Sequence, residues 1–202
     1  MNVFENEHLA PNRYFDRSFN TDAVKILPGE YFATSENTMI VTVLGSCVSA
    51  CIRDPIAGIS GMNHFLLPAN ADEENFDSES ARYGVFAMEI LINHMMKLGA
   101  QRNRLEAKVF GGANVLKGFT SISVGQKNSA FVQEYLEAEK IRVVATDLLG
   151  EFPRKLYQFP ETGEVKVRKL KSMHNTTIID RESEYRVKII QTATKGGDVD
   201  LF

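Results

Sequence analysis

Short apolar segments that end at turn residues dominate the chain from Gly29 onward, and this pattern limits it to a fold built around β-sheet. Two longer segments carry apolar residues at helical spacing, and each falls between segments with strand character. Because the strands outnumber the helices without strict alternation, we predict an α/β or α+β fold, in which a mixed sheet is layered with two main helices. The expected strands span residues 30–33, 38–44, 48–53, 59–67, 105–110, 141–146, 155–159, 165–170 and 185–190, and the expected helices span residues 80–98 and 124–139.

The two ends of the chain differ from this central part. Residues 1–26 are polar with isolated aromatic residues and have no helical or strand period, so we expect an N-terminal extension on the body of the protein. Residues 27–192 are numerous enough to bury a substantial core and are predicted to form one domain. Residues 193–202 contain a glycine pair followed by acidic and apolar residues. We expect a flexible tail there, with a docking peptide for a partner as the alternative.

The composition is that of a soluble globular protein, with 24% charged and 44% hydrophobic residues. The formal net charge of -3 gives no electrostatic footprint for nucleic acid. The chain opens without a basic segment followed by an apolar one, and no apolar run approaches the length of a membrane span. We therefore expect a cytoplasmic protein that inserts into no membrane and whose partners are proteins or small molecules.

The sequence has no pattern for a bound cofactor. Cys47 and Cys51 are the only cysteines, and on an extended strand about 13 Å would separate them, which is beyond disulfide reach. The cysteines and histidines follow no zinc-ligand spacing. The segment after Gly111-Gly112 lacks the Gly-Lys-hydroxyl ending of a phosphate-binding loop, and no G-x-G-x-x-G occurs. We predict no disulfide, no metal and no nucleotide cofactor.

Cys47 is a candidate nucleophile because of the residues around it. It follows Gly45-Ser46 at the end of an apolar run, where the freedom of glycine permits a sharp turn that projects a side chain from a sheet edge. His64 follows in another apolar segment, and a close imidazole lowers the pKa of a thiol and stabilises the thiolate. The commoner role of a free cysteine is that of a small hydrophobic core residue, and this interpretation suits Cys51 in the middle of a strand.

The pattern around this pair leaves alternatives open. Alternation through residues 60–66 places His64 on an apolar face, where a core histidine is the commoner outcome, so a catalytic interpretation requires that Cys47 is close. Thr42, at the end of the preceding strand, is a candidate to orient the imidazole, although threonine is also simply a good strand residue. Gly111-Gly112 either turns the chain or allows a substrate or a second loop to approach the backbone closely.

Several segments, in the same order and spacing, resemble the CheD family, the chemoreceptor glutamine deamidases of bacterial chemotaxis. The resemblance covers about residues 29–170, and its motifs together are far more specific than one Cys-His pair. It implies a layered α/β sandwich, similar to the catalytic domain of the cytotoxic necrotizing factor toxins, with Cys47, His64 and Thr42 as the catalytic set and no cofactor. The matching segments are residues 42–51, 61–68, 106–113, 124–128, 147–150 and 162–168.

The resemblance also implies a reaction. Cys47 attacks the side-chain carboxamide of a receptor glutamine, and His64 protonates the departing nitrogen and then activates the water that hydrolyses the thioester. Backbone N–H groups near the turn that carries Cys47 are expected to stabilise the oxyanion. The candidate residues for the oxyanion and the substrate walls are Gly45, Ser46, Gly111 and Gly112, together with loop 70–77. The implied partners are the cytoplasmic domains of chemoreceptors and a CheC-type phosphatase.

Three other interpretations of the same residues remain open. The first is a thiol protease or acyltransferase that acts at a backbone carbonyl, and the second is a non-catalytic chemotaxis adaptor that binds receptors or CheC. The third is a redox sensor, for which Cys51 is badly placed as a resolving thiol. Both enzyme interpretations expect the sulfur of Cys47 and the imidazole of His64 to meet at an accessible surface.

Overall fold

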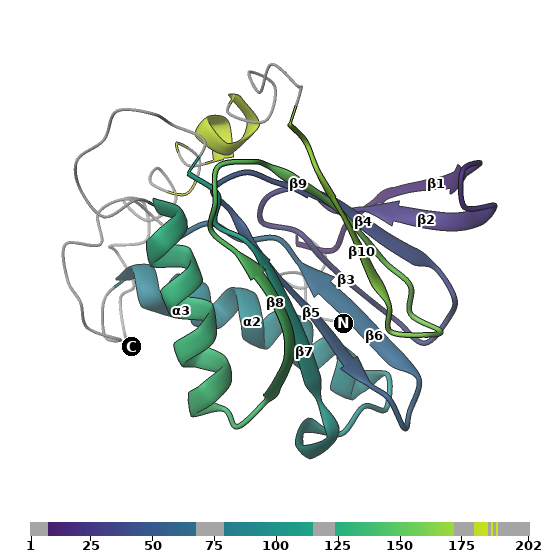
Figure 1. Cartoon of the computed structure of the whole chain (residues 1–202). Helices are drawn as coiled ribbons and strands as arrows, with labels where there is room; N and C mark the ends of the chain where they lie inside the picture. Colours follow the sequence, from purple (N-terminus) through teal and green to yellow (C-terminus); the bar gives the residue numbers. More distant parts are fainter. Residues whose placement is uncertain are drawn as a thin grey trace, which may run out of the picture.

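The computed structural model describes residues 8–67, 79–114, 124–171 and 180–185, together with residues 187 and 189. Within these residues the chain forms two five-stranded sheets, and two main helices cover one side (Figure 1). The mixed α/β architecture that we expected is confirmed, with two mixed sheets in place of one. The elements are β1 (Asn12–Asp16), β2 (Thr21–Lys25), β3 (Tyr31–Thr34), β4 (Met39–Leu44), β5 (Val48–Asp54), β6 (Ile59–Asn63), α2 (Glu79–Lys97), the 3-10 turn η1 (Arg102–Arg104), β7 (Glu106–Gly111), α3 (Val124–Ala138), β8 (Arg142–Leu148), β9 (Arg154–Gln158) and β10 (Val165–Lys169).

The sheets stack as two layers, and the helices form a third. The central sheet has the order β3-β6-β5-β7-β8, and the outer sheet has the order β1-β2-β4-β9-β10. Each is antiparallel except at one pair, β7 with β8 in the central sheet and β2 with β4 in the outer sheet. Helix α2 packs on β3 and β6, and α3 packs on β5, β7 and β8, so both helices lie against the central sheet.

Two apolar clusters fill the spaces between these layers. On β5, Val48, Ala50 and Ile52 face the helices, whereas Cys51 faces the outer sheet. This alternation follows from the two-residue period of a strand. Residues 48–52 of β5 are buried on both faces, so this strand contacts both clusters.

Residues 1–26 show no strand period in the sequence, but the part of them that the structure describes contains two strands. β1 and β2 pair as an antiparallel hairpin, and β2 adds it to the outer sheet beside β4. The sequence does not alternate because the first four residues of β1 are exposed on both faces, while Ala23 and Val24 are both buried, on opposite faces of the sheet. Whether residues 1–26 form a separate unit from residues 27–192 stays a prediction.

The strand expected at residues 185–190 is wrong. Residues 180–185, 187 and 189 are helical, and they form the yellow-green helix near the top of Figure 1. Tyr185, Val187 and Ile189 alternate with polar residues, which imitates a strand. The buried positions are instead Glu182 and Ile189, with Tyr185 partly buried, and these residues share one face of a helix. Residues 70–77 and 193–202, predicted to be a loop and a tail, lie outside the described residues.

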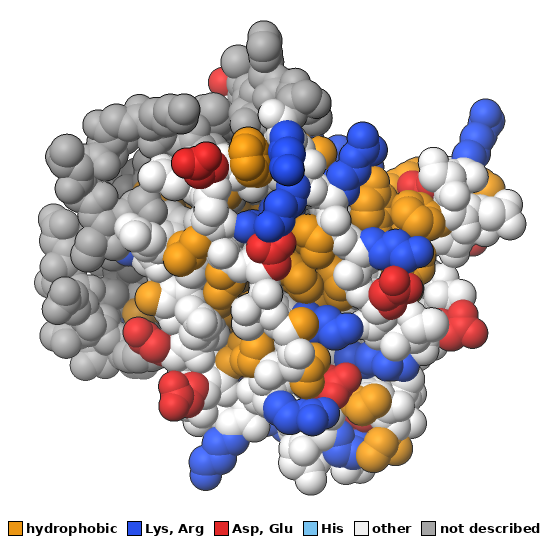
Figure 2. Space-filling view, viewed as in Figure 1, with side chains coloured by type: hydrophobic (Ala, Val, Ile, Leu, Met, Phe, Trp, Pro, Cys, Tyr) orange, Lys and Arg blue, Asp and Glu red, His pale blue; other side chains and the backbone are white. Residues whose placement is uncertain are grey.

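The outer surface of the described residues has mixed charge. Figure 2, in the view of Figure 1, shows Lys and Arg side chains interspersed with acidic and apolar ones over the strands. No helix among the described residues is long and apolar enough to span a membrane.

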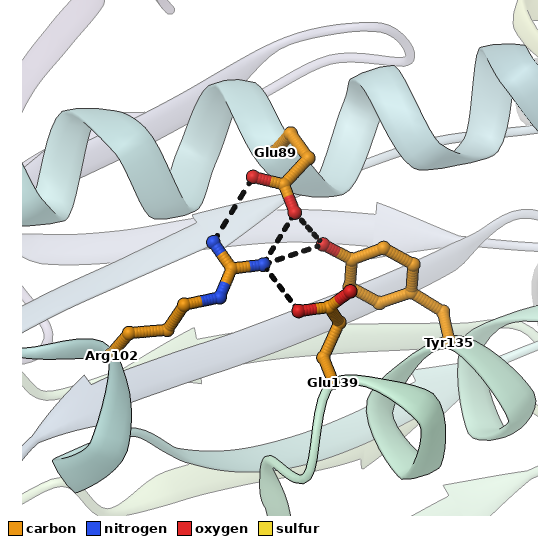
Figure 3. A network of polar contacts seen from close by, with 4 residues as sticks. All are labelled: Glu89, Arg102, Tyr135 and Glu139. Atoms are coloured by element: carbon orange, nitrogen blue, oxygen red, sulfur yellow. Dashed lines mark hydrogen bonds and ion pairs between the residues drawn. The ribbon is translucent and has the colours of Figure 1, made fainter.

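A partly buried ionic network ties the two main helices together (Figure 3). Arg102, in η1, donates to both carboxylate oxygens of Glu89 on α2, at 3.2 and 2.5 Å, and to Glu139 after α3 at 2.7 Å. The Tyr135 hydroxyl donates to the same Glu89 carboxylate. These charge-assisted bonds join segments that are far apart in sequence and hold α2 beside α3.

We expect Arg102→Ala to lower the free energy of unfolding by about 1–2 kcal/mol, because it leaves two carboxylates and a tyrosine without their shared cation. Urea denaturation monitored by circular dichroism measures this loss. The matched control is Arg142→Ala, whose side chain is 75% exposed and pairs only with Glu106 among the described residues, and which should stay within about 0.5 kcal/mol of the parent protein. Equal effects of the two substitutions would contradict this assignment.

Candidate active site

Cys47 lies where the chain crosses from the outer sheet to the central sheet. Residues 45–47 form the short connection between β4 and β5. The carbonyl of Cys47 accepts a hydrogen bond from the Gly112 N–H at 2.8 Å, and the carbonyl of Gly45 accepts one from the Ala113 N–H at 2.8 Å. The crossing is therefore held against the end of β7.

The glycine pair at the end of β7 is required by this close approach. Gly111 and Gly112 have φ values of +114° and +67°, which side chains disfavour. A Cβ on Gly111 would also lie closer to the carbonyl of Cys47 than van der Waals contact allows. Of the roles that we considered for this pair, the structure shows the approach of a second loop, and that loop carries Cys47. A role in contacting the substrate stays a prediction.

His64 follows β6 and is brought beside this crossing by one pair of backbone hydrogen bonds. Val48 and Phe65 each donate an N–H to the carbonyl of the other at 3.0 Å. Both of these side chains lie in the cluster under the helices. Because side chains alternate along paired strands, Cys47 and His64 both point the other way, toward the outer sheet. The local pairing thus brings together two residues that are seventeen positions apart in the sequence.

Thr42 approaches the same point from the outer sheet. On β4, the neighbouring inward positions are Ile40 and Leu44, so the Thr42 hydroxyl lies in an otherwise apolar layer and is fully buried. Its oxygen lies 2.9 Å from the carbonyl oxygen of Ile26 and 2.8 Å from Nδ1 of His64. A carbonyl can only accept, so the single hydroxyl proton goes to Ile26, and Thr42 accepts from His64.

This arrangement fixes the tautomer of the imidazole. With its proton on Nδ1, a neutral His64 has a lone pair on Nε2, and Nε2 has no hydrogen-bond partner among the residues that the structure describes. A ring nitrogen of His64 lies within 4.8 Å of Sγ of Cys47. Since Nδ1 is engaged by Thr42, Nε2 is the nitrogen left for the thiol.

The protonation state of His64 follows from its burial. Burial lowers the pKa of His64 from 6.5 to about 4, although the nearby Glu182 carboxylate acts in the opposite direction. The imidazole is therefore neutral near pH 7, which is the form that accepts a proton. Cys51 differs, because burial raises the pKa of its thiol to about 12 and it lies within the apolar layer between the sheets, as its strand position predicted.

Glu182, from the C-terminal helical segment, completes the group. One carboxylate oxygen accepts hydrogen bonds from the N–H groups of Gly45 and Cys47, at 2.8 and 3.2 Å. The other accepts from the N–H and the hydroxyl of Ser46, at 2.9 and 2.6 Å. A Cβ on Gly45 would lie 2.9 Å from this carboxylate, so the glycine leaves room for Glu182. Three consecutive backbone donors thus converge on one anion, and two of them belong to predicted oxyanion residues.

The structure brings Cys47, His64 and Thr42 together as the sequence predicted, but not at an open surface. Cys47 is 0% exposed and His64 is 2% exposed. The expectation that the sulfur is accessible is therefore not met in this conformation, in which Glu182 lies against the site.

Comparison with known proteins assigns the family. The family model described as "CheD chemotactic sensory transduction" matches residues 66–169. "Probable chemoreceptor glutamine deamidase CheD 1" of Shewanella oneidensis is 65% identical over 193 residues, which cover 95% of this chain and 93% of that protein. This chain belongs to the CheD family. A second relative, "Probable chemoreceptor glutamine deamidase CheD" of Methylobacillus flagellatus, is 59% identical over 97% of both chains.

Among solved structures, the Bacillus licheniformis hypothetical protein YfiH is weakly similar to this CheD chain. The TM-score is 0.39 and the sequence identity is 10%, over 59% of this chain and 51% of that chain. This likeness is too weak to assign a fold.

Three residues that contact the backbone around this CheD site were not found from the sequence. Asn128, on α3, donates to the carbonyl of Ser46 at 2.9 Å and accepts from the Leu67 N–H at 2.9 Å, so it joins the segments that carry Cys47 and His64. Arg154, on β9, is buried and donates to the carbonyl of Gly111 at 2.6 Å. Asn128 lies in a segment that resembles the family, but nothing local indicated its partners. The third residue, Glu182, lies just before the strand predicted at residues 185–190, and no local pattern indicated its contacts with the 45–47 connection.

The thiol, the imidazole and the carboxylate of Cys47, His64 and Glu182 place a sulfur, a nitrogen and an oxygen within 4.8 Å of one another. These are donor types that a metal ion such as zinc uses. Both oxygens of Glu182 already accept hydrogen bonds from the 45–47 connection, so the carboxylate already has an established role. That the CheD site works without a metal stays a prediction.

We expect Thr42→Val to lower the free energy of unfolding by about 1–3 kcal/mol, because it removes the buried hydroxyl that bonds to both His64 Nδ1 and the carbonyl of Ile26. Thr42→Ser keeps the hydroxyl and should cost less. Urea denaturation measures stability, and nitrogen-15 NMR of the imidazole should show the Nδ1–H tautomer in the parent and the serine variant. A valine variant as stable as the serine variant would contradict this role.

The low pKa of His64 predicts that acid destabilises the fold. The unfolded chain binds a proton at His64 near pH 6.5, whereas the folded protein binds it only near pH 4, so stability falls as the pH drops through this window and this contribution levels off below it. The free energy of unfolding, measured from pH 7.5 to 4, should fall more steeply for the parent than for His64→Gln. Parallel curves for the two proteins would refute this account.

Proposed function

We propose that this protein is a chemoreceptor glutamine deamidase in which Cys47 is the nucleophile, His64 is the general acid and base, and Thr42 orients His64. The observation that carries the proposal is the position of His64: Thr42 bonds to Nδ1, Nε2 has no partner among the described residues, and a ring nitrogen lies within 4.8 Å of the sulfur of Cys47. The printed function of the two relatives supports the reaction and the class of substrate.

In the first half of the reaction, His64 Nε2 takes the proton of the Cys47 thiol, and the sulfur forms a bond to the Cδ carbon of a substrate glutamine. His64 then gives this proton to the amide nitrogen, the C–N bond breaks and ammonia leaves. A thioester between Cys47 and the former glutamine side chain remains.

In the second half, His64 Nε2 takes a proton from water, and the water oxygen bonds to the thioester carbon. The C–S bond breaks, the sulfur regains a proton, and the side chain leaves as glutamate. Each turnover replaces a neutral amide with a negative charge on the receptor.

Both steps pass through a tetrahedral intermediate with a negatively charged oxygen. The N–H groups of Gly45, Ser46 and Cys47 already bind carboxylate oxygens at 2.8, 2.9 and 3.2 Å, which supports their assignment to this oxygen. Gly112 has its N–H engaged by the carbonyl of Cys47, so its support for the reaction is indirect, through the position of that residue.

The proposal extends to the setting in which the enzyme works. We assign the cytoplasmic domains of chemoreceptors as its substrate, the cytoplasm as its location and a CheC-type phosphatase as a further partner. The layered sandwich is proposed to be similar to the catalytic domain of the cytotoxic necrotizing factor toxins.

Incubation with cytoplasmic receptor fragments, followed by digestion and mass spectrometry, tests the reaction. We expect conversion of specific glutamines to glutamate in intact peptides, no conversion with Cys47→Ala, and a roughly 10²- to 10⁴-fold slower rate with His64→Ala. The matched control is Cys51→Ala, which removes the other thiol from the apolar layer and should leave the reaction in place.

Other outcomes identify other functions. Cleaved or acyl-transferred peptides would indicate a thiol protease or acyltransferase. Receptor binding without any glutamine conversion, in the parent as in Cys47→Ala, would indicate an adaptor, and activity that follows oxidation of Cys47 would indicate a redox sensor. Each of these results contradicts the deamidase proposal.

A further inference from the structure

The C-terminal helical segment, residues 180–185, places the side chain of a glutamate in the group of donors beside Cys47. We propose that this segment is an intramolecular inhibitor, in which Glu182 mimics the glutamate product and must leave before a substrate glutamine binds. The inference rests on the proposed function, because glutamate is the product of that reaction. It adds a regulatory role for a part of the chain outside the catalytic set.

The contacts of Glu182 are those expected of a bound product. Its carboxylate is held by the backbone N–H groups of Gly45, Ser46 and Cys47 and by the hydroxyl of Ser46, and the residue is 7% exposed although it lies on a surface segment. Within the same segment, Glu184 is exposed. The site thus selects one carboxylate of the helix.

Occupation by Glu182 is incompatible with the reaction. The N–H groups that would stabilise an oxyanion are already saturated by a carboxylate, and a second negative oxygen at the same place would be repelled. A carboxylate oxygen of Glu182 also lies within 4.8 Å of the sulfur of Cys47, where it opposes formation of a thiolate. The described conformation is therefore a resting state.

A second residue of the segment fastens it over the site. The hydroxyl of Tyr185 forms a hydrogen bond with that of Tyr83 on α2, and its ring packs on Gly29, where a Cβ would clash with it. Gly29, His64 and Tyr83 are also among the residues that line one small pocket. Glu182 and Tyr185 are three residues apart, so one face of the helix contacts both the connection that carries Cys47 and the hydroxyl of Tyr83 on α2.

The segment and a substrate compete for the same donors, so the fraction of molecules in which the segment is displaced sets the apparent affinity for the receptor. A glutamine side chain bound in place of Glu182 would direct its carboxamide oxygen at the same N–H groups. Removal of the segment should therefore lower KM and leave kcat nearly unchanged.

Alkylation by iodoacetamide tests the occlusion without any need for deamidase activity. We expect Cys47 to react about tenfold faster in Glu182→Ala, and in a chain that ends at residue 179, than in the parent. Cys51 serves as an internal control, because it is buried between the sheets and should stay unreactive in all variants. Glu184→Ala removes an exposed carboxylate from the same segment and should react as the parent does. Equal rates for the parent and Glu182→Ala would overturn the proposal.

Kinetics with receptor fragments test the competition. Glu182→Ala and the shortened chain should lower KM severalfold at unchanged kcat, and Glu184→Ala should do neither. A lower kcat with an unchanged KM would overturn the proposal, because Glu182 would then assist the reaction. If no variant converts glutamine, the proposed function fails, and the alkylation rates still decide whether Glu182 covers Cys47.

Glu182→Gln places a substrate group in the site itself. We expect the introduced glutamine to be converted back to glutamate within the same molecule, as a mass increase in the C-terminal peptide that is independent of protein concentration and absent from the double variant with Cys47→Ala. A different result is a variant that deamidates receptor fragments and yet keeps the glutamine at position 182. That result would overturn the claim that residue 182 occupies the place of the substrate side chain.

Discussion

The hydrogen bond between Thr42 and His64 is the interaction on which the rest of the site depends. It joins the outer sheet to the segment that follows β6 in the central sheet, across a layer that is otherwise apolar. Its 2.8 Å length requires that the two sheets stack at a fixed separation, which the apolar side chains between them provide. Because Thr42 gives its only proton to the carbonyl of Ile26, the same bond also decides which nitrogen of His64 faces the sulfur.

The position of the sulfur depends on backbone contacts that surround the crossing between the sheets. Gly112 holds the carbonyl of Cys47, and Asn128 holds the carbonyl of Ser46. Arg154 reaches from the outer sheet to the carbonyl of Gly111, so the end of β7 is itself fixed from the other layer. These contacts come from the end of β7, from α3 and from β9. Together they fix the position of residues 45–47.

Much of this arrangement was predictable from local pattern. The strands β3 to β10 and both main helices follow from apolar periodicity. The sequence also indicated Cys47, His64 and Thr42 as candidate catalytic residues, and the structure brings them together. Periodicity failed where burial does not alternate, as in the hairpin of β1 and β2, whose exposed first strand has no apolar face. It also failed at residues 185–190. Over so few positions, apolar and polar residues of a short helix can alternate by chance and so imitate a strand.

The contacts that three distant side chains make with the backbone of the site could not be predicted, for a different reason. Asn128, Arg154 and Glu182 act on backbone groups, and a backbone carbonyl or N–H leaves no trace in the identity of the residue that carries it. Gly45 illustrates the point: its turn was attributed to conformational freedom, yet its φ lies outside the positive range in which Gly111 and Gly112 fall. What it provides is room for the carboxylate of Glu182, a residue 137 positions away.

Three N–H groups of residues 45–47 converge on the carboxylate of Glu182, and this convergence explains why a glutamate side chain binds well there. Buried donors without an acceptor are costly, so a pocket built for an oxyanion needs another acceptor whenever substrate is absent. Water can fill this role only if the pocket stays wet, and a wet pocket would weaken the effect of burial on the pKa of His64. The carboxylate of Glu182 satisfies the donors while it excludes solvent. The donor geometry that we propose for the oxyanion would thus itself create a binding site for the product group, and a glutamate on the same chain fills it at a high effective concentration.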